Sequence, residues 1–300
     1  MNWAFLFCSL AIFFFSTLEF VGKLIGTGIN PLAVTVYRFM LGSIFLLIPA
    51  IYQIRKTKLK LSGKDLLLMS VPGILNTAIS MYLLQLSVFY GKALIAAIII
   101  SSNSVFVSIF AYFILKEKMS KSRVIGIITG IAGMLFVIAG NAGEDRTPAK
   151  SISLGVIFAI AAAIFFALYT VLSKKMIKSY GNIVYNSVSF FSGAVVLMLI
   201  GFMLNVDYSF KVNLVNIGSL VYLGFIVTGL AYFFYAKGLE KIPASSSSMF
   251  FLLKPVFASI LAVLILRESF SYLQACGLIL ILAGLSLEYV WENLYKKGSD

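Results

Sequence analysis

The sequence has no histidine, only two cysteines and few acidic residues. Its 300 residues include 11 Asp and Glu against 24 Lys and Arg, and the two cysteines are Cys8 and Cys276. This inventory supplies neither a set of metal ligands nor a disulfide framework, so we expect no metal site and no cofactor. Intramembrane enzymes group acids, histidines or metal ligands at one place, and the lack of such a group argues against an enzyme.

Charged residues of both signs are scarce, whereas hydrophobic residues are abundant. Charged residues make up 12% of the chain, against about a quarter in soluble domains. Hydrophobic residues make up 61%, and the mean hydropathy is +1.01. The chain is therefore expected to be an integral membrane protein whose partners are a small-molecule substrate and the lipid bilayer. The net charge of +13 does not indicate nucleic acid, because no basic domain stands apart from the apolar segments.

The apolar residues fall into stretches that are long enough to cross a bilayer, which takes about 20 residues in a helix. Ten can be delimited: Trp3–Leu24, Pro31–Gln53, Leu66–Phe89, Ala93–Leu115, Val124–Gly140, Leu154–Ile177, Ile183–Asn205, Leu214–Lys237, Ala244–Leu266 and Tyr272–Trp291. The only linker of different composition is "NAGEDRTPAK", residues 141–150. The sequence predicts an all-α membrane protein with ten transmembrane helices, five in residues 1–140 and five in residues 151–300.

The two halves repeat each other at an offset of 151 residues. "LKEKMS" at Leu115–Ser120 matches "LRESFS" at Leu266–Ser271, and Gly126 matches Gly277. Asn103 falls opposite Lys254 at the same offset. So many matches at constant spacing indicate two copies of one five-helix unit. Because five is odd, the second copy would enter the membrane inverted.

The distribution of basic residues predicts the orientation. With the N-terminus inside, inner loops and the tail hold sixteen of the Lys and Arg residues, including the run from Arg55 to Lys64, and outer loops hold six. This asymmetry predicts a multi-pass protein of the cell membrane with both termini cytoplasmic. An inverted repeat is common in secondary transporters, where the two copies form a site near the midplane and work by alternating access.

The stretch "AYFFYAKGLEKIPASSSSMFFLLKPVFASILAVLILRESFSYLQACGLILILAG" resembles the second EamA repeat of the drug/metabolite transporter superfamily. In the first half, "YRF", "LKEKMS" and "GIITGIAG" carry the same resemblance, which covers essentially the whole chain. It implies a ten-helix solute carrier, commonly an exporter of metabolites, amino acids or drugs, driven by a gradient or by exchange. It leaves open whether the protein is a monomer or a homodimer.

Lys254 is the leading candidate for substrate binding. It lies about ten residues into an apolar stretch, at midplane depth, where a lysine costs on the order of 3 kcal/mol. Pro255 lacks an amide hydrogen and breaks the helix beside it. Lys254 would bind an anionic group, or would form a structural ion pair with Glu19 or a backbone carbonyl. "LKPV" is similar to a phosphate-binding Lys-Arg pair of plastid sugar-phosphate translocators, and Pro255 in place of the arginine favours a carboxylate.

Glu19 is the candidate coupling residue, in the outer half of the first expected helix. Small multidrug-resistance relatives have a membrane glutamate in their first helix, and this resemblance implies a role for Glu19 as proton carrier or as ligand of an ammonium group. The alternative is a fixed ion pair with Arg38, which lies at a similar depth in the next helix. Arg38 is expected to be structural, near an outer gate.

Further polar residues are candidates for substrate binding because helical spacing or the repeat places them near the expected cavity. Those in the second half are Ser247, seven residues before Lys254, then Thr228, Tyr232 and Tyr235 at i, i+4 and i+7, and Tyr169 with Thr170, near the repeat position of Glu19. Those in the first half are Asn76 and Ser80 at i, i+4, and Asn103, the repeat partner of Lys254, on the opposite wall. For each, the alternative is an ordinary hydrogen bond between helices.

Two loop glutamates and a set of glycines have structural interpretations. Glu117 and Glu268 lie beside Lys116 and Arg267, and we expect them to form interfacial ion pairs or to cap helices. The glycines of "GIITGIAG", which are Gly126, Gly130 and Gly133, are expected to allow close helix packing or dimer contact.

The sequence favours a secondary transporter of a small charged organic solute, an amino acid or a similar metabolite. Lys254 would hold its carboxylate, and Glu19 would hold its ammonium group or the coupling proton. The alternatives are a proton-coupled exporter of lipophilic cations and an organic-phosphate exchanger.

Overall fold

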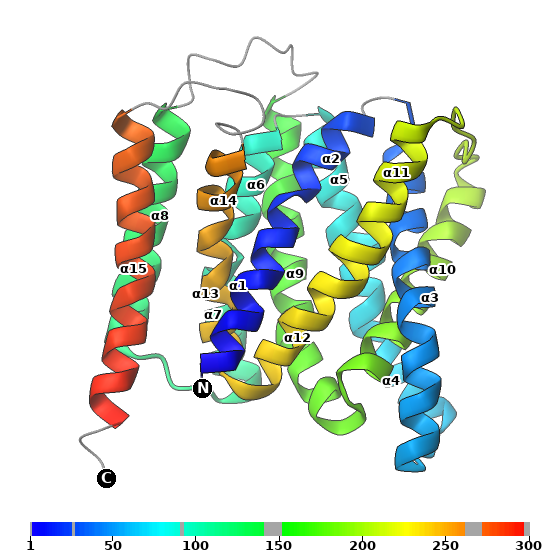
Figure 1. Cartoon of the computed structure of the whole chain (residues 1–300), viewed down its shortest axis with the longest axis horizontal. Helices are drawn as coiled ribbons and strands as arrows, with labels where there is room; N and C mark the ends of the chain where they lie inside the picture. The colour runs from blue at the N-terminus through cyan, green and yellow to red at the C-terminus, as the bar shows by residue number, and fades with distance from the viewer. Residues whose placement is uncertain (1, 26–27, 91–92, 141–151, 262–271, 297–300) are drawn as a thin grey trace.

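The computed structural model describes residues 2–25, 28–90, 93–140, 152–261 and 272–296. Within these ranges the chain forms helices and short connections, with no strand. The helices run between an upper and a lower edge in Figure 1. The α-helix α1 begins and α15 ends at the lower edge. An all-helical fold is therefore confirmed.

The helices of the first half are α1 (Asn2–Ser16), α2 (Leu18–Ile25), α3 (Pro31–Thr57), α4 (Gly63–Ile74), η1 (Leu75–Met81), α5 (Tyr82–Tyr90), α6 (Ala93–Ser101), α7 (Asn103–Phe110), η2 (Ala111–Leu115) and α8 (Lys121–Gly140). Those of the second half are α9 (Ile152–Tyr180), α10 (Asn182–Met203), α11 (Leu214–Tyr222), η3 (Leu223–Leu230), α12 (Ala231–Lys241), α13 (Ala244–Met249), η4 (Phe250–Leu253), α14 (Lys254–Leu261) and α15 (Tyr272–Lys296).

Seven helices of the described residues are long and apolar enough to cross a membrane. They are Trp3–Gly22, Pro31–Thr57, Gly63–Tyr90, Ala96–Leu115, Ser153–Tyr180, Asn182–Met203 and Leu214–Lys241. Each overlaps one of the ten expected stretches. The other three expected stretches include residues or side chains outside the described part of the chain, so the count of ten stays a prediction.

Local sequence signals explain where several helices begin and end. The Asn30 side chain accepts a hydrogen bond from the Leu32 amide, and Pro31 opens α3 with a φ already suited to a helix. Lys58 ends α3 in the left-handed conformation. Ser62 and Asp65 form a reciprocal capping box at the start of α4. These signals produce the short turn between α3 and α4 at the lower edge.

Several expected spans contain breaks in regular α-helix. The π-helical segments η1 and η3 interrupt the third and the eighth spans, and they occupy similar positions in the two halves. The 3₁₀ segment η4 ends directly before Lys254 and Pro255. The expectation of a break at Pro255 therefore agrees with the structure. The π segments were not foreseen, because an extra residue in a turn is fixed by the packing of neighbouring helices.

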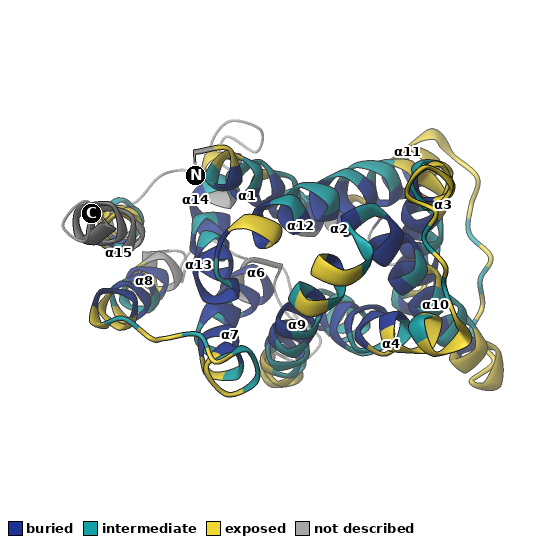
Figure 2. Ribbon diagram, turned by 90° about the horizontal axis from the view of Figure 1, so that it is seen from below, coloured by how far each residue is buried: buried dark blue, intermediate teal, exposed yellow. Residues whose placement is uncertain are grey.

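Large apolar side chains cover the outer surface of the bundle. Ile48 is 77% exposed, Leu67 65% and Ile128 63%. Figure 2 shows that buried residues face inward on the central helices. This distribution is typical of a protein whose outer surface contacts lipid.

The helices α8 and α15 lie side by side, set off from the other helices (Figures 1 and 2). A Cβ on Gly126 would lie 2.6 Å from the Gly284 carbonyl oxygen, and one on Gly133 2.6 Å from that of Gly277. One on Gly130 would lie 2.6 Å from a methyl group of Leu252. The expectation that these glycines allow close packing is confirmed, and two of them join helices that match each other in the repeat.

Candidate functional site

Eight buried or mostly buried aromatic rings form a connected group in the protein interior, called here the central aromatic cluster. Its members are Phe15, Phe39, Phe166, Tyr169, Phe190, Tyr232, Tyr235 and Phe251. Tyr232 contacts most of the others: its ring lies 4.8 Å from those of Phe15 and Phe190. The rings come from α1, α3, α9, α10, α12 and η4, so the cluster joins both halves of the chain.

Four of these rings occupy matching positions in the two halves. Phe15 and Phe166 are 151 residues apart, as are Phe39 and Phe190. The rings of Phe39 and Phe190 contact each other at 5.2 Å. Phe15 and Phe166 both contact Phe251, at 5.8 and 5.2 Å. The interior is therefore built by equivalent residues of the two copies meeting one another.

Asn76 and Tyr232 meet beside this cluster. The Tyr232 hydroxyl lies 3.4 Å from both the amide nitrogen and the amide oxygen of Asn76. Both residues are buried, and both were predicted from helical spacing. The Ser80 hydroxyl instead donates a hydrogen bond to the Ala162 carbonyl oxygen at 2.8 Å. For Ser80 the structure therefore shows the alternative given above, an ordinary hydrogen bond between helices. Tyr169 is part of the cluster through ring contacts with Phe166 and Tyr232.

Arg38 is buried within the first half and reaches into the second. Its Nε donates a hydrogen bond to the Thr228 hydroxyl at 3.1 Å, and its guanidinium carbon lies 4.8 Å from the Phe39 ring centroid. It is 1% exposed. The predicted residue Thr228 thus binds Arg38. The side chain of Glu19 lies outside the described residues, so its proposed pairings stay predictions.

Lys254 opens α14, directly after the 3₁₀ segment η4. It is 2% exposed, and Phe251 of the central aromatic cluster lies one turn before it. Pro255 is also buried. A fully buried lysine in a bundle that faces lipid is costly, and residues of this kind commonly mark substrate or ion pathways.

Polar atoms without hydrogen-bond partners lie on neighbouring helices. Both amide atoms of Asn103 and the hydroxyls of Ser104 and Ser247 have no such partner among the described residues. Asn103 and Ser104 are on α7, which packs against α13, the helix of Ser247. A buried polar group that lacks a partner costs about 1–3 kcal/mol, so these atoms are suited to bind a ligand or water.

The sequence reasoning missed three further buried polar residues. Thr77 Oγ1, Asn186 Oδ1 and Ser189 Oγ have no hydrogen-bond partner among the described residues. Thr77 and Ser189 match Thr228 and Arg38 at the offset of 151. The repeat was therefore a signal that could have found Thr77 and Ser189.

Comparisons with known proteins identify the family of the chain. The EamA-like transporter family matches twice, over residues 2–139 and 153–289. The chain belongs to the EamA-like transporter family. The two matches are offset by about the spacing of the repeat, so the duplication is shown. Membership in this family supports transport across a membrane as the general role.

Relatives within this family are similar over nearly the whole chain. An "Uncharacterized transporter" of Clostridium kluyveri is 35% identical over 302 residues, which cover all of this chain and 96% of the relative. The "Uncharacterized transporter YwfM" of Bacillus subtilis is 29% identical, with 93% of this chain and 91% of the relative covered. One solved structure, described as "Crystal structure of protein", is similar with a TM-score of 0.77 at 18% identity, covering 96% of each chain. That likeness shows the fold alone.

Proposed function

We propose that the protein is a secondary active transporter that moves a small charged organic solute, an amino acid or a similar metabolite, by alternating access. The observation that carries this proposal is Lys254, a buried lysine at a helix break beside the central aromatic cluster. A broken helix at the midplane is a common way to build a substrate site in transporters, because it exposes backbone groups to the substrate.

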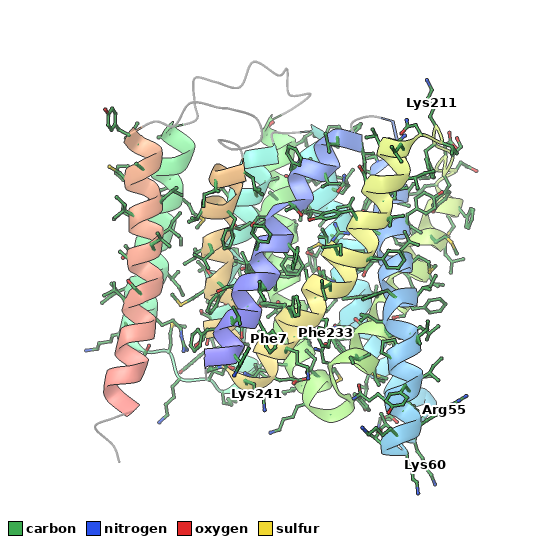
Figure 3. The ribbon with its side chains drawn as sticks, in the orientation of Figure 1. Phe7, Arg55, Lys60, Lys211, Phe233 and Lys241 are labelled. Carbon is green, nitrogen blue, oxygen red and sulfur yellow. The ribbon has the colours of Figure 1, made fainter. Side chains whose placement is uncertain are left out.

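The proposed architecture has ten transmembrane helices in two inverted copies. The duplicated family match supports it, as does the start of α1 and the end of α15 at one edge. In Figure 3, Arg55, Lys60 and Lys241 lie toward the lower edge, whereas Lys211 lies at the upper edge. The positive-inside rule then assigns the lower edge to the cytoplasm and places both termini there.

The substrate carboxylate would bind Lys254, with the amide of Asn103 and the hydroxyl of Ser247 as hydrogen-bond donors. Asn103 is the repeat counterpart of Lys254, and its amide has no partner among the described residues. Asn76, Tyr232 and other polar members of the site would contact the rest of the solute. Two buried cations, Lys254 and Arg38, disfavour a lipophilic cation as substrate, because like charges repel strongly in a medium of low polarity.

Glu19 would carry the coupling proton or bind an ammonium group. If Glu19 carries the proton, Glu19→Gln stops pH-driven net transport but permits exchange. If Glu19 is fixed to Arg38, the same substitution destabilises the protein, and Glu19→Gln with Arg38→Gln restores stability. Melting temperature measured beside exchange and net uptake in liposomes separates these two roles. A stable Glu19→Gln protein with normal pH-driven net transport contradicts both.

A ligand screen by thermal shift tests the proposed site. Purified protein is heated with amino acids, organic phosphates or cationic dyes. A binding carboxylate raises the melting temperature of the wild type, and Lys254→Gln abolishes that rise. Lys237→Gln is the matched control, because Lys237 is a surface lysine paired with Glu240. If the ligand raises the melting temperature of Lys254→Gln as much as that of the wild type, Lys254 is not part of the binding site.

A further inference from the structure

Glu117 lies in the connection between η2 and α8 and contacts the start of α13, which follows Lys241 at the lower edge in Figure 3. Its carboxylate accepts hydrogen bonds from the Ala244 amide at 2.8 Å and the Ser245 amide at 3.2 Å. It also accepts one from the Ser245 hydroxyl at 2.7 Å. Ala244 and Ser245 are the first residues of α13, and no side-chain cap from the preceding Pro243 serves that end of the helix. Glu117 therefore supplies the cap from a distant segment, as the sequence predicted in general terms.

Two basic residues extend this contact. Lys174 of α9 lies 3.5 Å from the Glu117 carboxylate, and its ammonium group also donates to the Ile242 carbonyl oxygen, just before α13. Arg123, near the start of α8, donates to the Ser246 hydroxyl of α13 at 2.9 Å. We call the group of Glu117, Arg123, Lys174, Ser245 and Ser246 the lower-edge latch.

The latch joins the two copies of the repeat. Glu117 and Arg123 belong to the first copy, whereas Lys174, Ser245 and Ser246 belong to the second. The helix that Glu117 caps continues through η4 to Lys254. If the copies rock against each other during transport, these contacts must break on the side that opens.

The chemistry of the latch suits reversible contact. Its Lys174 and Glu117 side chains are 26% and 14% exposed, so water can replace the ion pair when the copies separate. The glycine contacts between α8 and α15 are of a different kind, because helix backbones pack directly against each other there rather than through an ion pair.

We propose that the lower-edge latch is the gate that closes this edge of the transporter, and that release of Glu117 from α13 opens a path toward the site of Lys254. The proposal rests on alternating access as stated above. It describes a contact rather than a substrate, so the two can be tested separately.

A buried reporter measures the state of the gate. Thr170 is fully buried on α9, one helical turn before Lys174 and on the same face. Thr170→Cys is made in a protein with Cys8→Ala and Cys276→Ala. A membrane-impermeant thiol reagent is added from each side, to inverted vesicles and to intact cells. The labelling rate requires no substrate, so it stays informative if the proposed solute is wrong.

Glu117→Gln should raise the labelling rate of the introduced thiol from the cytoplasmic side about tenfold, because a neutral amide loses charge-assisted hydrogen bonds and the ion pair. Ser245→Ala removes one donor and should raise the rate by a smaller factor, about threefold. Glu240→Gln is the control: it breaks an ion pair within α12 and should leave the rate unchanged.

An unchanged labelling rate in Glu117→Gln would overturn the proposal that the latch is a gate, and so would an equal increase of that rate in Glu240→Gln. If Glu117→Gln does not fold, the labelling rate of Ser245→Ala is used instead. A wild-type labelling rate in Ser245→Ala would then overturn the proposal. Acceleration only from the opposite side would show that the proposed membrane orientation is wrong, while the latch still closes its own edge.

Discussion

The two copies of the repeat have the same glycines where their helices cross, but they differ in the polar residues one helical turn from those glycines. Gly42 of α3 and Gly193 of α10 match at the offset of 151. A Cβ on Gly42 would lie 3.0 Å from the Gly224 carbonyl oxygen, and a Cβ on Gly193 would lie 2.5 Å from that of Gly73. Gly73 and Gly224 also match each other. Both copies therefore use the same glycine-to-glycine crossing, each time against the other copy.

One turn before these glycines the copies differ in chemistry. Arg38 in the first copy donates to Thr228, whereas the matching Ser189 and Thr77 have no hydrogen-bond partner among the described residues. Another matching pair of positions differs in the same way, with Asn103 in the first copy and Lys254 in the second. The duplicated scaffold is retained, and the residues that could bind or couple are found where the copies diverge.

The largest expected effect comes from adding a methyl group to a glycine at the helix crossing that both copies share. A Cβ on Gly73 would lie 2.0 Å from the Ser189 carbonyl oxygen, so Gly73→Ala forces α4 and α10 apart. We expect a loss of about 3 kcal/mol or more in folding free energy. Gly218→Ala is the control, because nothing lies within 4 Å of its new methyl group, and it should be neutral or slightly stabilising. Melting temperatures in detergent compare the two. Equal stability would show that the crossing is not close-packed.

A smaller effect is the difference in stability loss between substitutions of Arg38 and of its repeat counterpart Ser189. Arg38→Met keeps the apolar stem but leaves Thr228 without its donor, which should cost about 2 kcal/mol. Ser189→Ala removes a hydroxyl that has no partner among the described residues, and should change stability by less than about 1 kcal/mol. Thermal unfolding of both variants measures the asymmetry. A larger loss in Ser189→Ala would mean that the second copy depends on its hydroxyl more than the first depends on its arginine.

The smallest expected effect concerns the pH dependence of the lower-edge latch. Burial opposes the ionisation of Glu117, but hydrogen bonds from Ser245 and the Ala244 amide, together with the charge of Lys174, lower its pKa below the ordinary 4.5. The charged group that lies against it, Lys174, is a cation, and Arg123 acts on Lys174 in turn. A lowered folded-state pKa adds stability that is present above pH 4.5 and is lost as the pH falls through the folded-state pKa.

Wild type should therefore melt higher than Glu117→Gln at pH 7, by the equivalent of about 1 kcal/mol. The difference should shrink as the pH falls below 4.5 and disappear once the pH is below the lowered pKa of folded Glu117. Melting curves of both proteins from pH 3 to pH 8 measure this. A difference that persists in acid would mean that the carboxylate charge does not stabilise the latch.

Sequence reasoning predicted the features that depend on spacing along the chain. The repeat follows from an offset of 151, and the close packing of Gly126, Gly130 and Gly133 follows from small residues at four- and three-residue spacing. Helical spacing selected Asn76 and Tyr232 as separate candidates, and the structure places the two in contact. Each of these features depends on spacing within one helix or between the two copies of the repeat, so it can be predicted from a single sequence.

Sequence reasoning could not predict properties that depend on how helices rotate against each other. Depth along the helix placed Arg38 near the level of Glu19, but it did not indicate that Arg38 faces Thr228 of η3. The bond from Ser80 to Ala162 depends on the packing of α9 against η1. Likewise, Glu117 was expected to pair or to cap, but its partner helix is more than a hundred residues away.

The central claim is that Lys254 binds an anionic solute during transport, and counterflow in liposomes tests it most directly. Liposomes containing the purified protein are loaded with an unlabelled solute found in the ligand screen, and entry of the labelled solute is followed. We predict rapid counterflow for the wild type and Lys237→Gln, and a reduction of about a hundredfold or more for a folded Lys254→Gln protein, as expected for a lost charge pair inside the bundle. Counterflow by Lys254→Gln at the wild-type rate would contradict the proposed site.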